Sequence, residues 1–179
     1  MRVLMLLPIA LTINWATSLY GQGEALKLGQ IPPLVTFDGK KEGGLVAGGE
    51  WSSSTLMGKV HTVFYVDPDE KKVNAHVEEA LKKEKFPLDN YQSVAIVNMR
   101  ATWMPKFIIS GLLKKKQERF TQTVFIKDRG KKLVKEWSLP DNSYNVLLFD
   151  KQGRLLYSKA TKFTDTDIAE LIVLVRNNL

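Results

Sequence analysis

The chain has 179 residues, of which 44% are hydrophobic and 25% charged, with a formal net charge of +7 at pH 7 and no cysteine. This length suits one globular domain with a sizeable hydrophobic core. Without cysteine, the chain has no means of dithiol exchange, no peroxidatic thiol and no thiolate metal site.

Residues 1–21 have the organisation of a secretory signal peptide. Met1 and Arg2 give a short cationic start, residues 3–13 are mostly apolar, and small and polar residues follow up to Gly21. The apolar run is about half of the ~20 residues that span a bilayer. We therefore expect cleavage after Ser18 or Gly21 and no integral membrane span. The alternative interpretation is a buried N-terminal helix.

The mature chain is then predicted to be a single domain over residues 22–179. Its excess of basic side chains favours anionic partners. Because export separates the protein from nucleic acid, we expect an envelope protein or an anionic envelope component as partner, and no nucleic acid. A charge of this size also simply keeps a small domain soluble. The oligomeric state stays open.

The stretch from Gly21 to Gly58 is rich in turn signals. They are paired prolines, paired glycines and an Asp-Gly step, at positions 32–33, 38–39, 43–44 and 48–49. We expect a β-rich N-terminal extension of short strands and loops that lies against the main domain.

Regular alternation of strands and helices follows Gly58. Residues 61–66 (HTVFYV) predict a buried strand, after which Asp67, Pro68 and Glu70 have the pattern of a helix N-terminus. Residues 93–98 (SVAIVN) predict a second buried strand. The helix expected over residues 104–118 would place Phe107, Ile108 and Leu112 on its inner face. A third strand is expected at 121–126 (TQTVFI).

The C-terminal third predicts antiparallel strands and a last helix. Residues 131–140 indicate either a short strand or a docked loop. Residues 145–149 and 154–158 predict a hairpin, and Thr164 is expected to cap the last helix. The order of elements predicts an α/β fold whose mixed central sheet has helices on both faces.

Several segments together resemble a known family. Residues 29–33 (GQIPP), 51–60 (WSSSTLMGKV) and 149–154 (FDKQGR) look like the peroxiredoxin-like branch of the thioredoxin superfamily. Residues 58–60, 86–98 (FPLDNYQSVAIVN) and 150–154 look more closely like the YtfJ family of exported bacterial proteins. The resemblance implies a thioredoxin-like fold and a periplasmic location in a Gram-negative bacterium. It implies no activity.

The chain departs from working thioredoxins at their redox site. Their Cys-x-x-Cys motif lies where the first central strand meets the next helix, and here residues 65–70 read YVDPDE. Their cis-proline precedes the hairpin, whereas Pro140 lies several residues too early. Thiol oxidoreductase and peroxidase activities are therefore excluded, and whether the chain catalyses another reaction stays open.

Two loops at the carboxyl ends of predicted strands are expected at the same edge of the sheet, where open α/β sheets bind ligands. The candidate ligand-binding residues at this edge are Tyr65, Asp67, Asp69, Arg100 and Trp103. The structural alternative is that Asp67 caps a helix, Trp103 packs under the next helix and Arg100 is solvated.

The sequence predicts no metal, cofactor or catalytic residue. The two histidines, His61 and His76, lie on different elements, without the three or more ligands of a zinc or iron site. Ser52, Ser53 and Ser54 lack the glycines of a nucleophile elbow. Two functions remain. One is a non-enzymatic binding or accessory module. The other is a non-thiol enzyme, or a binder of a small ligand or anion, at the Asp67 and Arg100 edge.

Overall fold

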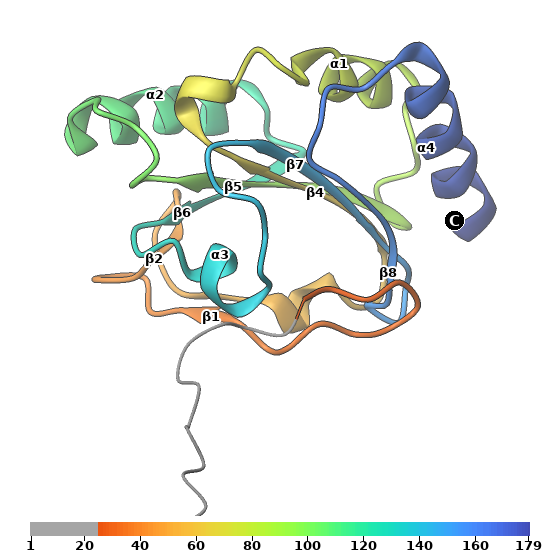
Figure 1. Ribbon diagram of the computed structural model, residues 1–179, viewed down its shortest axis with the longest axis horizontal. Helices are drawn as coiled ribbons and strands as arrows, with labels where there is room; N and C mark the ends of the chain where they lie inside the picture. Colours follow the sequence, from red (N-terminus) through yellow and green to blue (C-terminus); the bar gives the residue numbers. More distant parts are fainter. Residues whose placement is uncertain (1–24) are drawn as a thin grey trace, which may run out of the picture.

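The computed structural model describes residues 25–179 (Figure 1). The predicted signal peptide, residues 1–21, lies outside the described residues. The elements in chain order are β1 (Thr36–Phe37), β2 (Gly43–Leu45), β3 (Trp51–Ser52), the 3-10 turn η1 (Ser53–Leu56), β4 (Val60–Val66), the 3-10 turn η2 (Pro68–Glu70), α1 (Ala75–Lys83), β5 (Tyr91–Asn98), α2 (Lys106–Arg119), β6 (Thr123–Asp128), α3 (Lys132–Glu136), β7 (Tyr144–Phe149), β8 (Leu155–Lys159) and α4 (Asp165–Asn178).

A six-stranded mixed sheet forms the centre of the molecule, in the order β2-β6-β5-β4-β7-β8. Strands β4, β5 and β6 are parallel, while β2, β7 and β8 join antiparallel. All seven residues of β4 are buried, as expected for a central strand covered on both faces. The predicted α/β architecture with a mixed sheet is confirmed.

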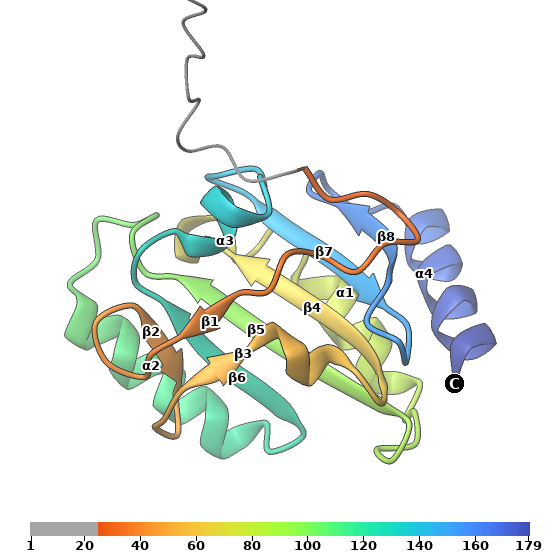
Figure 2. The ribbon, with the colours of Figure 1, turned by 90° about the horizontal axis from the view of Figure 1, so that it is seen from below.

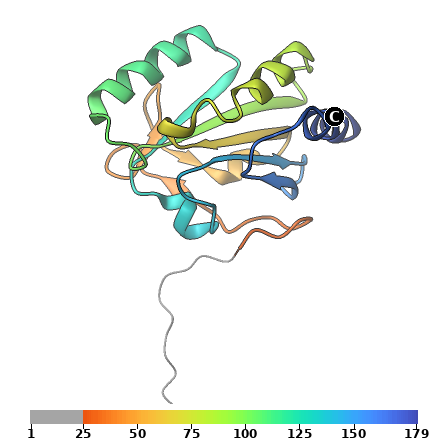
Figure 3. The same cartoon turned by 45° about the horizontal axis from the view of Figure 1, so that its top comes forward.

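Helices α1, α2 and α4 cover one face of the sheet, and α3 lies on the other face with the N-terminal extension (Figures 1 and 3). The core on the α1 and α4 side includes Phe64, Val77 and Leu171, and α2 adds Ile109 and Leu113. The opposite core includes the fully buried side chains of Tyr65, Ile96, Ile126, Leu133, Trp137 and Phe149.

The N-terminal extension is part of this second core. It crosses the sheet face in Figure 2, where β1 pairs with β3 and β2 extends the main sheet. Phe37 and Trp51 are buried against it. A Cβ at Gly43 would lie 1.8 Å from the carbonyl oxygen of Lys127, so only glycine lets β2 approach β6 this closely. The predicted extension of short strands and loops is confirmed.

The first helix begins later than predicted. Asp67 makes no side-chain cap, and only the single turn η2 follows it before α1 begins at Ala75. Asn74, the residue before α1, is held by tertiary hydrogen bonds and does not cap the helix with its side chain. Its amide donates to the carbonyl oxygens of Tyr144 and Thr161, and its Oδ1 accepts from the backbone of Phe163. These partners are far away in sequence, so no local pattern could reveal them.

Helix α2 is rotated relative to the prediction. Ile109 and Leu113 face the sheet, whereas Phe107 is 77% exposed and Leu112 is 48% exposed. The helix has apolar side chains over a broad arc, and residues one position apart are turned by about 100°. The stripe with Ile109 and Leu113 therefore packs on the sheet, and the predicted inner stripe, Phe107, Ile108 and Leu112, lies beside it on the helix.

The segment predicted as a strand or docked loop is instead the short helix α3. Its first turn follows Lys131, which adopts the left-handed conformation at φ 55°. Trp137 ends the helix, and its indole Nε1 donates to the carbonyl of Pro33 at 2.8 Å. This contact fastens α3 to the extension. No helix within residues 25–179 is long and apolar enough to cross a membrane.

Candidate functional site

Three adjacent parallel strands end in buried polar residues. Asp67 follows β4, Asn98 ends β5 and Asp128 ends β6, and none of the three is more than 1% exposed. Asn98 pairs with Asp128 in the sheet register, and Asp67 comes one position after the pair of Val66 with Val97. With Lys131 and Asp141 from the segment around α3, these residues form what we call the edge cluster.

Asp128 anchors the α3 segment to the sheet. Its Oδ2 accepts hydrogen bonds from the Tyr65 hydroxyl at 3.1 Å and the backbone amide of Leu133 at 3.2 Å. Its Oδ1 accepts from the amide of Gly130 at 2.9 Å. Burial, with the negative charge of Asp128, raises the pKa of Tyr65 far above its usual value. Tyr65 is therefore a structural hydrogen-bond donor, held protonated at any physiological pH.

Asp67 is buried without a full set of partners. Its Oδ2 accepts from the amide of Ser143 at 2.8 Å, while its Oδ1 is the one buried side-chain polar atom in residues 25–179 without a hydrogen-bond partner. Burial raises the pKa of Asp67 to about 6, although the Ser143 amide and Asn98 lower it in part. The carboxyl group can thus gain or lose a proton near neutral pH.

Asp141 closes the cluster on the side of the loop before β7. It accepts from the Asn98 amide at 3.2 Å and pairs with the ammonium of Lys131. Burial acts to raise the pKa of Asp141, but the hydrogen bond from Lys131 and the backbone amide of Asn142 outweigh it, so this pKa lies below its usual value. Asp141 therefore stays ionised beside the protonatable Asp67.

The structure brings the two predicted loops together but separates the five candidate residues into two groups. The hydroxyl of Thr102 donates to Asp69 Oδ1 at 2.9 Å and so joins the loops. Tyr65 and Asp67 point into the protein, whereas Asp69, Arg100 and Trp103 lie on the surface.

Trp103 is 86% exposed, so the interpretation that it packs under the next helix is wrong. The interpretation of Asp67 as a helix cap is also wrong, because its side chain caps no helix and its carboxylate accepts from the backbone amide of Ser143 instead. Arg100 is exposed, and only its backbone amide joins the edge, by donating to Asn98 Oδ1 at 3.1 Å.

The residues that complete the cluster, Asn98, Asp128, Lys131 and Asp141, were not singled out from the sequence. A polar residue at the end of an otherwise apolar strand was the available signal for Asn98 and Asp128. Lys131 and Asp141 gave no such signal, because they reach the edge only through the fold of the α3 segment.

A groove lies on the opposite face of the sheet, between α1 and α2, and encloses about 680 Å³. None of the five candidate residues lines it. Volumes of this size are typical of small-ligand sites. The groove has an apolar floor and a largely basic rim.

Both histidines have structural hydrogen bonds. His61 is buried and its Nδ1 donates to the carbonyl of Lys59 at 2.9 Å, while desolvation lowers its pKa. His76 donates through Nε2 to the carbonyl of Phe163 at 3.1 Å. Within residues 25–179, no group of three or more His, Asp or Glu side chains is arranged to hold a metal ion.

Comparisons with known proteins place the chain beside a family without an assigned activity. A family model described as a bacterial protein of unknown function (YtfJ_HI0045) matches residues 41–178. The uncharacterized protein YtfJ of Escherichia coli (strain K12) is 28% identical over 132 residues, which are 72% of each chain. An uncharacterized protein of Haemophilus influenzae is 31% identical over 132 residues, which are 70% of each chain.

Solved structures show the fold. A thiol peroxidase from Chromobacterium violaceum superposes with a TM-score of 0.60 at 11% identity, over 88% of this chain and 91% of that one. A thiol-disulfide isomerase from Corynebacterium glutamicum gives 0.58 at 18% identity, over 83% and 96%. The fold is thioredoxin-like, as the resemblance implied, in a chain that contains no cysteine.

Proposed function

The chain belongs to the YtfJ family of bacterial proteins of unknown function, and on this premise we propose that it is an exported periplasmic protein that binds a partner without catalysing a reaction. The observation that carries the proposal is the edge cluster. It fills the sheet edge near residues 65–70, where a working thioredoxin holds its thiols, with hydrogen-bonded polar groups. Thiol chemistry is absent because the chain has no cysteine.

The bonding within the edge cluster supports a structural role. Asp128 fixes α3, Asp141 pairs with Lys131, and Asp67 fixes Ser143. A catalytic group must touch its substrate. The 1% exposure of Asp67 leaves almost no surface for such contact, while the exposed Arg100 is not among its bonding partners.

An acid–base enzyme is the second candidate, and one observation favours it. Asp67 combines a pKa raised to about 6 with an Oδ1 that lacks a partner, and perturbed carboxyl groups are common at active sites. This reading requires the segment of Asp141 and Ser143 to move away and admit a substrate. We place it second because it needs that movement and the binding function does not.

The N-terminal pattern and the excess of basic side chains support the periplasmic location and an envelope partner. Residues 1–21 predict a signal peptide, and the charge of +7 favours anionic partners. We propose an envelope protein or an anionic envelope component of a Gram-negative host as the partner.

The test is fractionation of the host cell followed by native mass spectrometry of the C-terminally tagged full chain. We expect the protein in the periplasmic fraction, shortened after Ser18 or Gly21, and carrying an extra mass that denaturation removes. A variant lacking residues 2–21 is the control and should stay in the cytoplasm. A full-length mass in the cytoplasm would contradict export, and a bare chain would contradict stable binding.

Catalysis is tested separately with a periplasmic extract. The purified protein and its Asp67→Asn variant are incubated with the extract, and the small molecules are compared over time. We expect no compound to be consumed by either protein. A compound consumed by the wild type and spared by the folded variant would establish the enzyme in place of the binding module.

A further inference from the structure

The groove between α1 and α2 has an apolar floor made by the sheet. Val66 from β4, Ala95 and Val97 from β5, Phe125 from β6 and Tyr144 from β7 line it. Since alternate residues of a strand share one face, these side chains form a continuous surface across neighbouring strands. Figure 3 shows α1 and α2 side by side over this face.

The wall on the α2 side combines residues that pack on the sheet with one residue of the second apolar stripe. Leu112 lines the groove beside Ile109 and Leu113, and Met104 lies at the N-terminal end of this wall. Leu112 remains 48% exposed. Of the second apolar stripe of α2, Leu112 lines the groove, while Phe107 and Ile108 lie outside the groove lining.

The groove continues into a second cavity of about 330 Å³ toward the amino end of β5. Both parts are lined by Glu78, Glu79, Arg119, Phe120 and Phe125, so they meet along the same cleft. Tyr91 and Ser93 belong to the second part and Val97 to the first. From Tyr91 to Val97 the strand rises ~20 Å. The two parts of the groove together therefore extend ~20 Å along β5.

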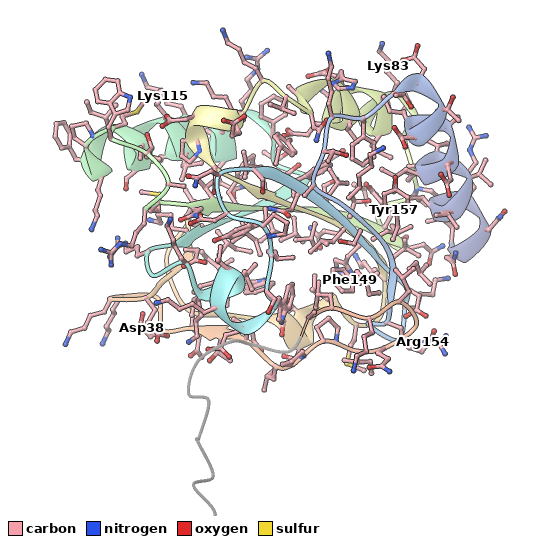
Figure 4. The ribbon with its side chains drawn as sticks, viewed as in Figure 1. Asp38, Lys83, Lys115, Phe149, Arg154 and Tyr157 are labelled. Carbon is pink, nitrogen blue, oxygen red and sulfur yellow. The ribbon has the colours of Figure 1, made fainter. Side chains whose placement is uncertain are left out.

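The rim of the groove is mainly basic. Two carboxylates, Glu78 and Glu79, border the larger part of the groove, the cavity of about 680 Å³. Glu78 accepts a hydrogen bond from the buried Tyr144 hydroxyl. Figure 4 shows Lys115 on α2 at the upper surface. The smaller cavity of about 330 Å³ adds Lys82 and Lys85. Seven basic side chains therefore border the two parts of the groove: Lys71, Lys72, Lys82, Lys85, Lys115, Lys116 and Arg119.

From this arrangement we propose that the groove binds an anionic amphiphile with a single hydrocarbon chain, of the fatty-acid class. The apolar floor and the Leu112 wall accept the chain, and the basic rim pairs with the anionic head. One acyl chain spans half of the ~30 Å hydrocarbon core of a bilayer, or ~15 Å, which fits within the ~20 Å that the two parts of the groove extend along β5. This inference rests on the proposed binding function and names its ligand class.

The test is isothermal titration calorimetry of the mature full-length domain with dodecanoate at concentrations below micelle formation. Dodecyltrimethylammonium has the same chain with a cationic head, and acetate has the same head without the chain. We expect one dodecanoate per protein molecule, at least tenfold weaker binding of the cationic amphiphile, and no heat from acetate.

Paired variants on α2 separate groove binding from nonspecific adsorption. Leu112→Gln removes apolar wall and should weaken dodecanoate binding roughly fivefold, whereas Phe107→Gln, on the same helix but outside the groove lining, should leave it unchanged. Lys115→Glu should weaken it roughly three- to fivefold, and Lys114→Glu, which does not line the groove, less than about twofold. Circular dichroism spectra establish that each variant is folded.

Equal binding of both amphiphiles, or loss of affinity in all four variants alike, would overturn the assignment of the groove. Cosedimentation with phosphatidylglycerol vesicles without binding of dodecanoate would also overturn it, in favour of a membrane surface. If dodecanoate fails while the periplasmic protein still carries another mass, the groove assignment falls and the binding function stands. If dodecanoate is bound and chemically altered, the non-enzymatic proposal falls and the groove assignment stands.

Discussion

Asp67 is a carboxyl group that the fold has taken out of water while supplying a partner to only one of its oxygens. The Ser143 amide bonds Oδ2, and Oδ1 has no partner. Burying a charge with incomplete hydrogen bonding favours the protonated form, which explains the raised pKa. The sequence placed Asp67 at the edge of the sheet, but its burial follows from Ser143, 76 positions away.

Stability should depend on pH through Asp67. The ordinary pKa is 3.8 and the folded value about 6, so between these values the folded state binds more protons than the unfolded state. The contribution to the free energy of unfolding is therefore full below about pH 4 and is lost as the pH rises through about 6. We expect a loss of up to about 3 kcal/mol for this rise in pKa.

The measurement is urea unfolding of the wild type and Asp67→Asn at pH 4 and pH 8. Other titrating groups are common to both proteins, so the difference between them isolates Asp67. The wild type should lose stability relative to the variant as the pH rises. A difference that stays constant across this range would refute the raised pKa.

Helix α4 shows how far local signals determine an element. Thr164 was expected as its cap, and its Oγ1 accepts from the amide of Asp167 while the Asp167 carboxylate accepts from the amide of Thr164. The hydrogen bond from Lys159, followed by those from Thr164, holds the pKa of Asp167 well below its usual value. Helix α1 lacks such a local box, and its start was predicted too early.

Removal of the α4 cap should be measurable. Thr164→Ala is expected to lower the free energy of unfolding by about 1 kcal/mol, because the amide of Asp167 loses its acceptor. Thr166→Ala, at an exposed position of the first turn, is the matched control and should change stability by less than about 0.5 kcal/mol. Equal effects in thermal unfolding would argue against the cap.

On the scale of the whole molecule, the N-terminal extension and α3 together cover one face of the sheet. Phe37 is fully buried and Trp51 is 5% exposed, with their ring centroids 5.8 Å apart. Because the extension closes the core beneath the edge cluster, it belongs to the folding unit. The opposite face, with its three helices, leaves the groove between α1 and α2.

The extension is tested by Phe37→Ala. This change removes a fully buried ring and should lower the free energy of unfolding by roughly 3–5 kcal/mol. Leu34→Ala, three residues away at a side chain that is 69% exposed, should have little effect. Comparable losses of stability in the two variants, measured by urea unfolding, would show that the extension does not contribute a core.

The sequence by itself determined the strands, the hairpin, the capped last helix and the absence of thiol chemistry. These follow from alternation of apolar residues, turn residues and composition, which act over a few neighbours. Only the tertiary structure decided the anchoring of Asn74 before α1, the rotation of α2, the edge cluster and the groove. Each of these depends on partners far away in sequence, and the energy of burial is set by such partners rather than by local pattern.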